Sequence, residues 1–147
     1  MAPAEVKLGN EVLVEGQFKV LQGKRLGLIT NPSGVNRNLE STVEVLHAAP
    51  GVKLAALFGP EHGVYGYNEA GEKVDTLVDK RTGLPAYSLY GKTHKPTPEM
   101  LKDLDALVYD LQDTGCRSYT YISTMGMAME ACGEAGLEFI VLDCPNP

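Results

Sequence analysis

The sequence lacks the features that would direct a protein into a membrane or onto nucleic acid. It contains no run of eighteen apolar residues, so we expect no membrane span. The segment from Met1 to Ala4 has neither a basic region nor an apolar core, and we expect no signal peptide in the chain as given. The net charge is −6 and the basic residues are scattered. This distribution argues against nucleic acid or an anionic membrane surface as the main partner.

Cysteines and glycine-rich phosphate motifs are also scarce. The three cysteines, Cys116, Cys132 and Cys144, form no C-x-x-C pair, so neither a disulfide framework nor a zinc knuckle is expected. The first strand-to-helix turn, TNPSGVNRN, has a single glycine where a dinucleotide site needs G-x-G-x-x-G, and no Walker sequence occurs. We therefore expect neither a cofactor nor a dedicated metal site.

What the sequence does contain is the apolar content of one ordinary domain. Its 147 residues are 44% hydrophobic, which is enough to bury a core without cross-links. Five apolar runs have the length of strands, and most are continuously apolar rather than alternating, which is typical of strands covered on both faces. These runs span residues 25–30, 52–58, 85–90, 106–111 and 137–143.

Helical patterns lie between these runs. We predict helices over residues 11–21, 38–49, 97–104 and 119–134. The third begins with Thr97-Pro98-Glu99, which combines a capping hydroxyl, a proline at the first position and an acid in the first turn. The fourth has an apolar face that we expect in the core. This face consists of Ile122, Met125, Met129 and Cys132.

The alternation of strands and helices predicts the fold class. We expect an α/β domain with a doubly wound, mostly parallel five-stranded sheet and helices on both faces, a Rossmann-like three-layer sandwich. With the strands numbered along the chain, their order in the sheet is expected to be 2-1-3-4-5 or 3-2-1-4-5. Residues 23–147 would form this domain, with residues 1–22 as a helical lead-in packed on it. Because the sequence stops directly after a strand, we expect a fragment of a longer protein.

One connection departs from the rhythm of strands and helices. The segment from Gly59 to about Leu84 exceeds twenty residues and has little periodicity. A loop of that length inside a compact domain is usually functional or mobile. It opens with GPEHG, in which Glu61 and His62 stand side by side on a turn.

Polar side chains follow several of the predicted strands, at the point where each strand ends. In open α/β sheets, ligands bind at the carboxyl ends of the strands. The opposite ends of the same strands carry ordinary turn sequences, and this asymmetry predicts a site at one rim of the sheet. The candidate residues are Asn31, Glu61, His62, Asp110, Asp113, Arg117, Tyr119, Tyr121, Asp143 and Asn146.

The charged candidates each have a structural alternative. Glu61 could donate a proton from a partly enclosed pocket, or it could be a solvated turn residue. Asp110 would need partners if buried, whereas Asp113 could cap the following helix. Arg117 could pair with Asp110, hold a substrate carboxylate or lie on the surface. His62 could orient the neighbouring acid, bind substrate or ligate a metal, and we favour a supporting polar role.

The remaining candidates also leave alternatives open. One of Tyr119 and Tyr121 is expected in the core, and the other could stack on a sugar. Asp143 and Asn146 could be a pair at the rim or a turn held by Asx hydrogen bonds. As a whole, the rim is consistent with a hydrolase, with a binding module that performs no chemistry, or with a metal-dependent hydrolase. The last would use His62 with Asp110 and Asp113.

Six segments of the sequence resemble a known family. They are GKRLGLITNPSGVNRNLEST, LFGPEHGVYG, AGEKV, TGLPAYSLYGKTHKPTPEML, DLQDTGCRSYTYISTMGMAMEA and VLDCPNP. In this order, from about residue 23 to residue 147, they resemble the NamZ-type exo-β-N-acetylmuramidases, long catalogued as a domain of unknown function. The resemblance implies a bacterial glycoside hydrolase that removes a non-reducing terminal N-acetylmuramic acid from peptidoglycan fragments during wall recycling.

The resemblance also implies roles for the residues at the rim. Glu61 would be the general acid, and Asp113 or Asp110 is the weaker candidate for a second carboxylate. Arg117 would hold the lactyl carboxylate of muramic acid. The other candidates would line the cleft. One position departs from the family, since Cys144 stands where an arginine is expected, and this weakens any claim for a charge contact there.

Two further expectations concern the rest of the protein. The family resemblance implies a smaller C-terminal domain, absent from these residues, that completes the cleft. It also implies an extracytoplasmic location, secreted or periplasmic, although the chain as given has no signal peptide. The expected partners are therefore a peptidoglycan-derived saccharide and the missing domain.

Overall fold

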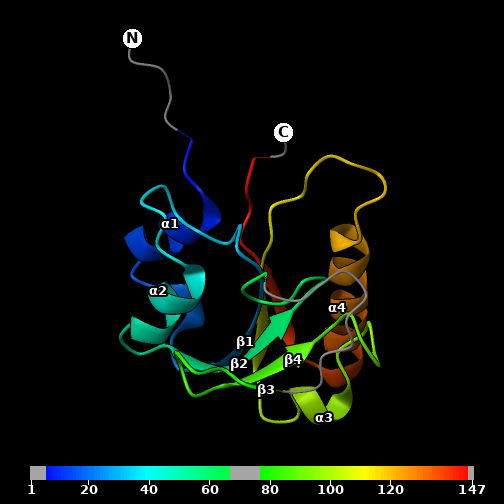
Figure 1. Ribbon diagram of the computed structural model, residues 1–147. Helices are drawn as coiled ribbons and strands as arrows, with labels where there is room; N and C mark the ends of the chain where they lie inside the picture. The colour runs from blue at the N-terminus through cyan, green and yellow to red at the C-terminus, as the bar shows by residue number, and fades with distance from the viewer. Residues whose placement is uncertain (1–5, 67–76, 146–147) are drawn as a thin grey trace.

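A computed structural model of the chain describes residues 6–66 and 77–145, and it contains one six-stranded sheet (Figure 1). The strands lie in the order β3-β4-β2-β1-β5-β6, and every neighbouring pair is parallel except β3 with β4. The strands are β1 (Arg25–Thr30), β2 (Lys53–Gly59), β3 (Leu77–Val78), β4 (Pro85–Ser88), β5 (Ala106–Asp110) and β6 (Glu138–Val141).

Helices cover both faces of this sheet. One face carries α1 and α2, and the other carries α3 and α4 (Figure 1). The helices are α1 (Gly9–Glu15), the 3-10 helix η1 (Lys19–Leu21), α2 (Thr42–Ala48), α3 (Pro98–Leu101) and α4 (Tyr121–Ala135). The predicted three-layer α/β class is confirmed. Within the described residues, no helix is both long and apolar enough to cross a membrane.

The strand order matches the second of the two predicted alternatives. Without β3, the order β4-β2-β1-β5-β6 is the predicted 3-2-1-4-5. The strand that the sequence did not reveal is β3, which pairs antiparallel with β4 at the edge of the sheet. A strand of two residues is too short to show the alternation of side chains that marks a strand in a sequence. The segment 59–84 was therefore predicted as a loop. Residues 67–76 of that loop lie outside the described residues.

Two apolar clusters, one on each face of the sheet, form the core. Leu26 and Leu28 of β1 point toward α1 and α2, whereas Ile29 points toward α4. Gly27 lies between them on the α4 side, where an added Cβ would be 2.5 Å from Leu107 Cδ2 and 2.7 Å from Phe58 Cε2. A glycine at this position therefore lets the side chains from β2 and β5 pack directly over β1.

The second predicted helix starts later than expected. Ser41 is its N-cap, because the Ser41 hydroxyl accepts a hydrogen bond from the Val43 amide at 3.2 Å. Leu39, which the pattern placed on the apolar face, precedes the helix with φ of 63° and is 79% exposed. The start predicted at Asn38 was wrong because a capping hydroxyl, rather than the apolar period, determines where this helix begins.

The packing face of α4 also differs from the prediction. Cys132 is buried as expected, but Ile122 and Met129 are 59% and 50% exposed. The residues that α4 buries against the sheet are Thr124, Ala128, Ala131 and Cys132. Small side chains allow the helix backbone to approach the strands closely. The larger side chains of Ile122 and Met129 therefore lie on the outer flank of the helix.

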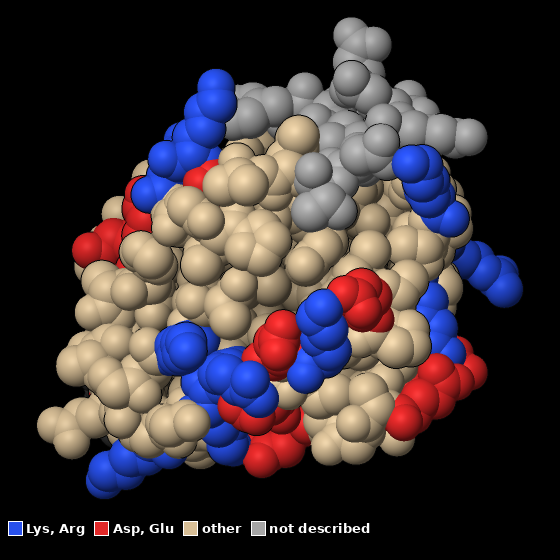
Figure 2. Space-filling model, turned by 90° about the horizontal axis from the view of Figure 1, so that it is seen from below, with Lys and Arg blue, Asp and Glu red and all other residues tan. Residues whose placement is uncertain are grey.

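The amino ends of the strands form a charged rim. Seen from below, this face carries Lys and Arg side chains interleaved with Asp and Glu (Figure 2). Arg25 begins β1, and Asp105 directly precedes the neighbouring strand β5. Arg25 Nη2 lies 3.0 Å from Asp105 Oδ1, and Lys24 Nζ lies 2.7 Å from Glu138 Oε2. The charges at this end are therefore paired with one another, in agreement with the ordinary turn chemistry expected here.

Candidate active site

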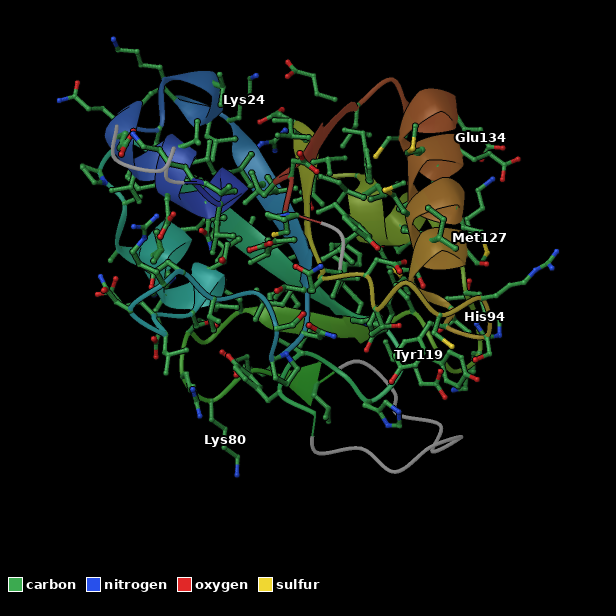
Figure 3. The ribbon with its side chains drawn as sticks, turned by 90° about the horizontal axis from the view of Figure 1, so that it is seen from above. Lys24, Lys80, His94, Tyr119, Met127 and Glu134 are labelled. Carbon is green, nitrogen blue, oxygen red and sulfur yellow. The ribbon has the colours of Figure 1, made fainter. Side chains whose placement is uncertain are left out.

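The carboxyl ends of the parallel strands meet at the opposite rim, which is seen from above in Figure 3. The segments that bring polar side chains to it include the turn after β2, the segment after β4 and the stretch that leads into α4. These segments are far apart in the sequence, and the sheet places them together. The sheet thus brings side chains from distant parts of the sequence to one rim.

Glu61 lies on the turn after β2 and is half-buried. The Thr120 hydroxyl, just before α4, donates a hydrogen bond to Glu61 Oε2 at 3.3 Å. Tyr90, which follows β4, also contacts this carboxylate. The negative charge of Glu61, together with burial and a hydrogen bond to Glu61, raises the pKa of the Tyr90 phenol. The carboxyl group therefore accepts a hydrogen bond from the segment before α4, and its charge acts on a phenol of the segment after β4.

The backbone of the GPEHG turn fixes where Glu61 lies. The Gly63 amide donates to the Pro60 carbonyl at 2.9 Å, which closes the turn. An added Cβ on Gly59 would lie 2.7 Å from the Val64 nitrogen, so only glycine fits where the chain passes back over the end of β2. His62 is exposed and has φ of 70°, an uncommon value for a residue with a side chain. Such conformations cluster at functional sites.

Asn31, at the end of β1, is the centre of a second group of hydrogen bonds. Its amide nitrogen donates to the Tyr121 hydroxyl at 2.9 Å, and its amide oxygen accepts from the Ser33 hydroxyl at 2.6 Å. The Ser33 oxygen in turn accepts from the Gln112 amide at 3.1 Å, and the Gln112 side chain donates to the Pro145 carbonyl at 2.9 Å. The ends of β1, β5 and β6 are therefore joined at the rim.

The two tyrosines before and at the start of α4 have different environments. Their rings pack edge to face with centroids 5.4 Å apart. Tyr121 is partly buried against the core, and burial is the main cause that raises its pKa. Tyr119 is 47% exposed on the rim (Figure 3). The structure thus makes Tyr121 the core residue of the pair and leaves the Tyr119 ring available to a ligand.

Asp110 lies at the rim but is enclosed, with 1% of its surface exposed. The Thr42 hydroxyl of α2 donates to Asp110 Oδ2 at 2.5 Å, and the Cys144 thiol lies 3.9 Å from Oδ1. Burial raises the pKa of Asp110, and these hydrogen bonds partly oppose it. The partner of Asp110 is therefore not Arg117, and its contacts come from α2 and from the segment after β6 rather than from the segments that contact Glu61.

Asp113 and Arg117 lie on the loop between β5 and α4. Asp113 Oδ1 accepts a hydrogen bond from the Gly115 amide at 2.7 Å, so it shapes this loop rather than capping α4. Asp113 is partly exposed, and Arg117 is exposed. Both side chains can therefore reach a ligand at the rim.

The candidates at the end of β6 are less closely connected with this group. Asp143 is exposed, and its carbonyl accepts a hydrogen bond from the Gly9 amide at 2.8 Å, which ties the start of α1 to this strand. Asn146 lies outside the described residues. In the part of the chain that the structure describes, no three His, Cys, Asp or Glu side chains form a group that could hold a metal ion. His62, Asp110 and Asp113 are thus not such a group.

Two residues that contact Glu61 were missed from the sequence. Tyr90 follows β4, so the same rule about strand ends that selected Glu61 could have found it. Thr120 stands between two tyrosines that the sequence singled out, and a small hydroxyl in a loop carries no signal of its own. Its importance is visible only because folding brings it to a carboxylate 59 residues away.

A mostly parallel sheet with its polar side chains gathered at the carboxyl ends of the strands defines a Rossmann-like protein of the open α/β class. A model of the family described as exo-β-N-acetylmuramidase NamZ, N-terminal, matches residues 26–147. The chain belongs to this family.

Proteins similar to this chain include a curated relative and two solved structures. The peptidoglycan β-N-acetylmuramidase NamZ of Bacillus subtilis (strain 168) is 57% identical over 143 residues, which are 97% of this chain and 34% of the relative. Two crystal structures of DUF1343 family proteins from Bacteroides fragilis NCTC 9343 are 65% and 33% identical, with TM-scores of 0.88 and 0.79. The matched regions include 96% and 98% of this chain. They include only 35% and 36% of the two solved chains. It therefore spans about a third of the length of its relatives.

Proposed function

We propose that this chain is the part of a peptidoglycan glycosidase that carries the general acid, Glu61. The protein would release a terminal N-acetylmuramic acid from the non-reducing end of peptidoglycan fragments. The observation that carries this proposal is the half-buried Glu61 carboxyl group at the carboxyl rim of the sheet, which accepts a hydrogen bond from Thr120 and lies near the Tyr90 phenol. The B. subtilis relative, named a peptidoglycan β-N-acetylmuramidase, supports the choice of substrate.

In this mechanism, Glu61 protonates the glycosidic oxygen as the bond to the leaving group breaks. The residue must then hold its carboxyl group in one place both before and after proton transfer. The hydroxyl groups of Thr120 and Tyr90 suit this task, because a hydroxyl can donate or accept a hydrogen bond. The Tyr90 phenol stays protonated beside the carboxylate, so it serves as a hydrogen-bond donor rather than as a nucleophile.

The second catalytic group is better sought in Asp113 than in Asp110. Asp113 is partly exposed on the loop that leads to α4, whereas Asp110 is enclosed by Thr42 and Cys144. A carboxylate that assists attack on the anomeric carbon must reach the substrate or a water molecule beside it. The acetamido group of the substrate is the alternative, because it can take the place of a second carboxylate.

The exposed residues beside Glu61 would recognise the sugar. Tyr119 offers an aromatic face on which an apolar face of a pyranose ring can stack. Arg117 offers a guanidinium group that pairs with the lactyl carboxylate of muramic acid in a bidentate arrangement. A cation at this place gives a net acidic protein the means to bind an acidic sugar.

The test is turnover of a chromogenic β-muramoyl substrate by the protein at its natural length. Glu61→Gln keeps the shape of the side chain and removes the proton, so kcat is expected to fall at least about 100-fold. Glu99→Gln, an exposed glutamate on α3, is the matched control and is expected to leave turnover unchanged. Near-normal turnover by Glu61→Gln would contradict the role of Glu61. Binding of muramic acid without any turnover by the unmutated protein would instead favour a non-catalytic binding module.

A further inference from the structure

Tyr90, whose phenol lies near Glu61, is one member of an aromatic pair. Its ring meets the His94 imidazole almost edge to face, with ring centroids 5.3 Å apart and an interplanar angle of 79°. Tyr90 is half-buried, and His94 is exposed at the rim (Figure 3). Aromatic rings attract each other in this arrangement, so each ring resists displacement of the other.

The backbone around His94 is held by its two neighbours. The Thr93 hydroxyl donates a hydrogen bond to the Lys95 carbonyl at 2.6 Å, and the Lys95 amide donates to the Thr93 hydroxyl oxygen at 3.2 Å. Lys95 Nζ lies 3.3 Å from Glu130 Oε2 and 2.8 Å from Glu134 Oε2, so the same turn is tied to α4. His94 is therefore the central residue of a short turn that is attached to a helix.

The backbone of Tyr90 is anchored at the other end of this segment. The buried Leu89, directly before it, donates its amide hydrogen to the Gly59 carbonyl at 2.8 Å, at the end of β2. The Tyr90 amide donates to the Ser88 hydroxyl oxygen at 3.2 Å. These hydrogen bonds fix where the Tyr90 side chain starts, but they do not fix its torsion angles. The direction of the phenol depends on what the ring packs against, and the His94 ring packs against it.

We propose that His94 is a positioning residue, whose ring keeps the Tyr90 phenol beside the Glu61 carboxyl group. The inference rests on the proposed role of Glu61 as the general acid. His94 acts here through the packing of its ring rather than through a charge or a proton, so another aromatic side chain can take its place. Its effect on turnover passes through the Tyr90 hydroxyl, which is the group that reaches the carboxylate.

An alkaline titration of Tyr90, followed by ultraviolet absorbance, tests the contact without any substrate. His94→Ala lets the phenol move away from the charge of Glu61 and is expected to lower the pKa of Tyr90, whereas His94→Phe is expected to preserve it. In the Glu61→Gln background, His94→Ala should change this pKa much less. His47→Ala, at an exposed position in the last turn of α2, is the matched control and should leave the titration unchanged.

Two outcomes of the titration overturn the proposal. The first is an unchanged pKa of Tyr90 in the His94→Ala protein. The second is an equal shift with and without the charge at Glu61, which would mean that His94 only shields the phenol from water.

Turnover by the protein at its natural length tests the catalytic consequence. His94→Ala is expected to lower kcat on a chromogenic β-muramoyl substrate roughly fivefold with little change in KM, and His94→Phe to restore it. In the Tyr90→Phe background, His94→Ala should cause no further loss, because the hydroxyl that it positions is gone. An equal loss in both backgrounds, a rise in KM, or failure of His94→Phe to restore kcat overturns the proposal, because His94 would then act on the substrate directly.

The two measurements separate this inference from the proposed function. If the unmutated protein does not turn over the substrate, the proposed function fails, and the titration still decides whether His94 holds the phenol. If Glu61→Gln abolishes turnover while His94→Ala changes neither turnover nor the titration, the role of His94 is overturned and that of Glu61 stands.

Discussion

At the scale of single residues, the environment of Glu61 distinguishes it from the other carboxylates of the rim. The Thr120 hydroxyl donates a hydrogen bond to its side chain, and its charge raises the pKa of Tyr90; both residues come from segments distant in sequence. Asp110, by contrast, accepts a hydrogen bond from Thr42, the first residue of α2, and is closed off from solvent. Two carboxylates at the same rim of the sheet thus differ in chemical role because their surroundings differ.

The contact between Tyr90 and Glu61 leads to a prediction at this scale. Tyr90→Phe keeps the ring and removes the hydrogen-bond donor, so the Glu61 carboxyl group is positioned less well. We expect kcat on a β-muramoyl substrate to fall roughly tenfold with little change in KM. Tyr87→Phe is the control, because the Tyr87 ring packs on Phe58 rather than on the carboxylate.

A spectroscopic measurement checks the same contact without any substrate. The charge of Glu61 raises the pKa of Tyr90, so Glu61→Gln is expected to lower it. Ultraviolet absorbance at alkaline pH follows ionisation of the phenol, and the Tyr90→Phe protein identifies which transition belongs to Tyr90. An unchanged titration of Tyr90 in the Glu61→Gln protein would show that the two groups do not interact.

At the scale of elements, the turn after β2 and the helix α4 use glycine for opposite reasons. Gly59 is required, since its missing side chain leaves room for the backbone of Gly63 and Val64. Gly133 is in the last part of α4, where an added Cβ would meet nothing within 4 Å. Glycine inside a helix lowers its stability relative to alanine because the unfolded chain loses more freedom on folding.

Two alanine substitutions are therefore expected to change the free energy of unfolding in opposite directions. Gly59→Ala forces the turn to move and should lower the free energy of unfolding by about 2 kcal/mol or more. Gly133→Ala should raise it by about 0.5–1 kcal/mol. Denaturant unfolding of residues 1–147 measures both. A neutral effect of Gly59→Ala would mean that the turn can relax away from β2, and that its geometry does not fix Glu61.

At the scale of the whole molecule, ion pairs join segments that are distant in sequence. Arg37 Nε lies 2.5 Å from Glu11 Oε1 and ties α1 to the loop before α2, and Arg25 binds Asp105 at the amino rim. Hydrogen bonds from these arginines lower the pKa of Glu11 and of Asp105 to about 2 each. Both carboxylates therefore favour the folded state only while they are ionised.

This pairing predicts how stability depends on pH. The pKa values of Glu11 and Asp105 are lower in the folded protein than in the unfolded chain. The stabilisation that each ion pair gives the folded state is therefore fully present above about pH 4.5 and is lost as the pH falls toward 2. The melting temperature is expected to fall over this interval. The fall should be smaller in the Glu11→Gln/Asp105→Asn protein, whereas Glu40→Gln should leave it unchanged. An equally steep fall in the double variant would contradict the assignment.

The sequence by itself determined the α/β class, five of the six strands, and the rim at which polar side chains gather. These features are local, because an apolar run, a turn sequence or a family motif can be recognised without knowing what it packs against. For β1, the predicted and observed bounds agree, since every residue from Leu26 to Thr30 is buried and the run is continuous.

Only the tertiary structure decided between the two strand orders, added β3, and turned Ile122 and Met129 of α4 outward. It also separated Asp110 from Glu61, since each carboxylate at a strand end takes its partners from whichever helices cover that side of the sheet. The contacts of Glu61 with Tyr90 and Thr120 could not be predicted from the sequence for the same reason. Which segments meet depends on the packing of the whole chain, and no short stretch of sequence contains that information.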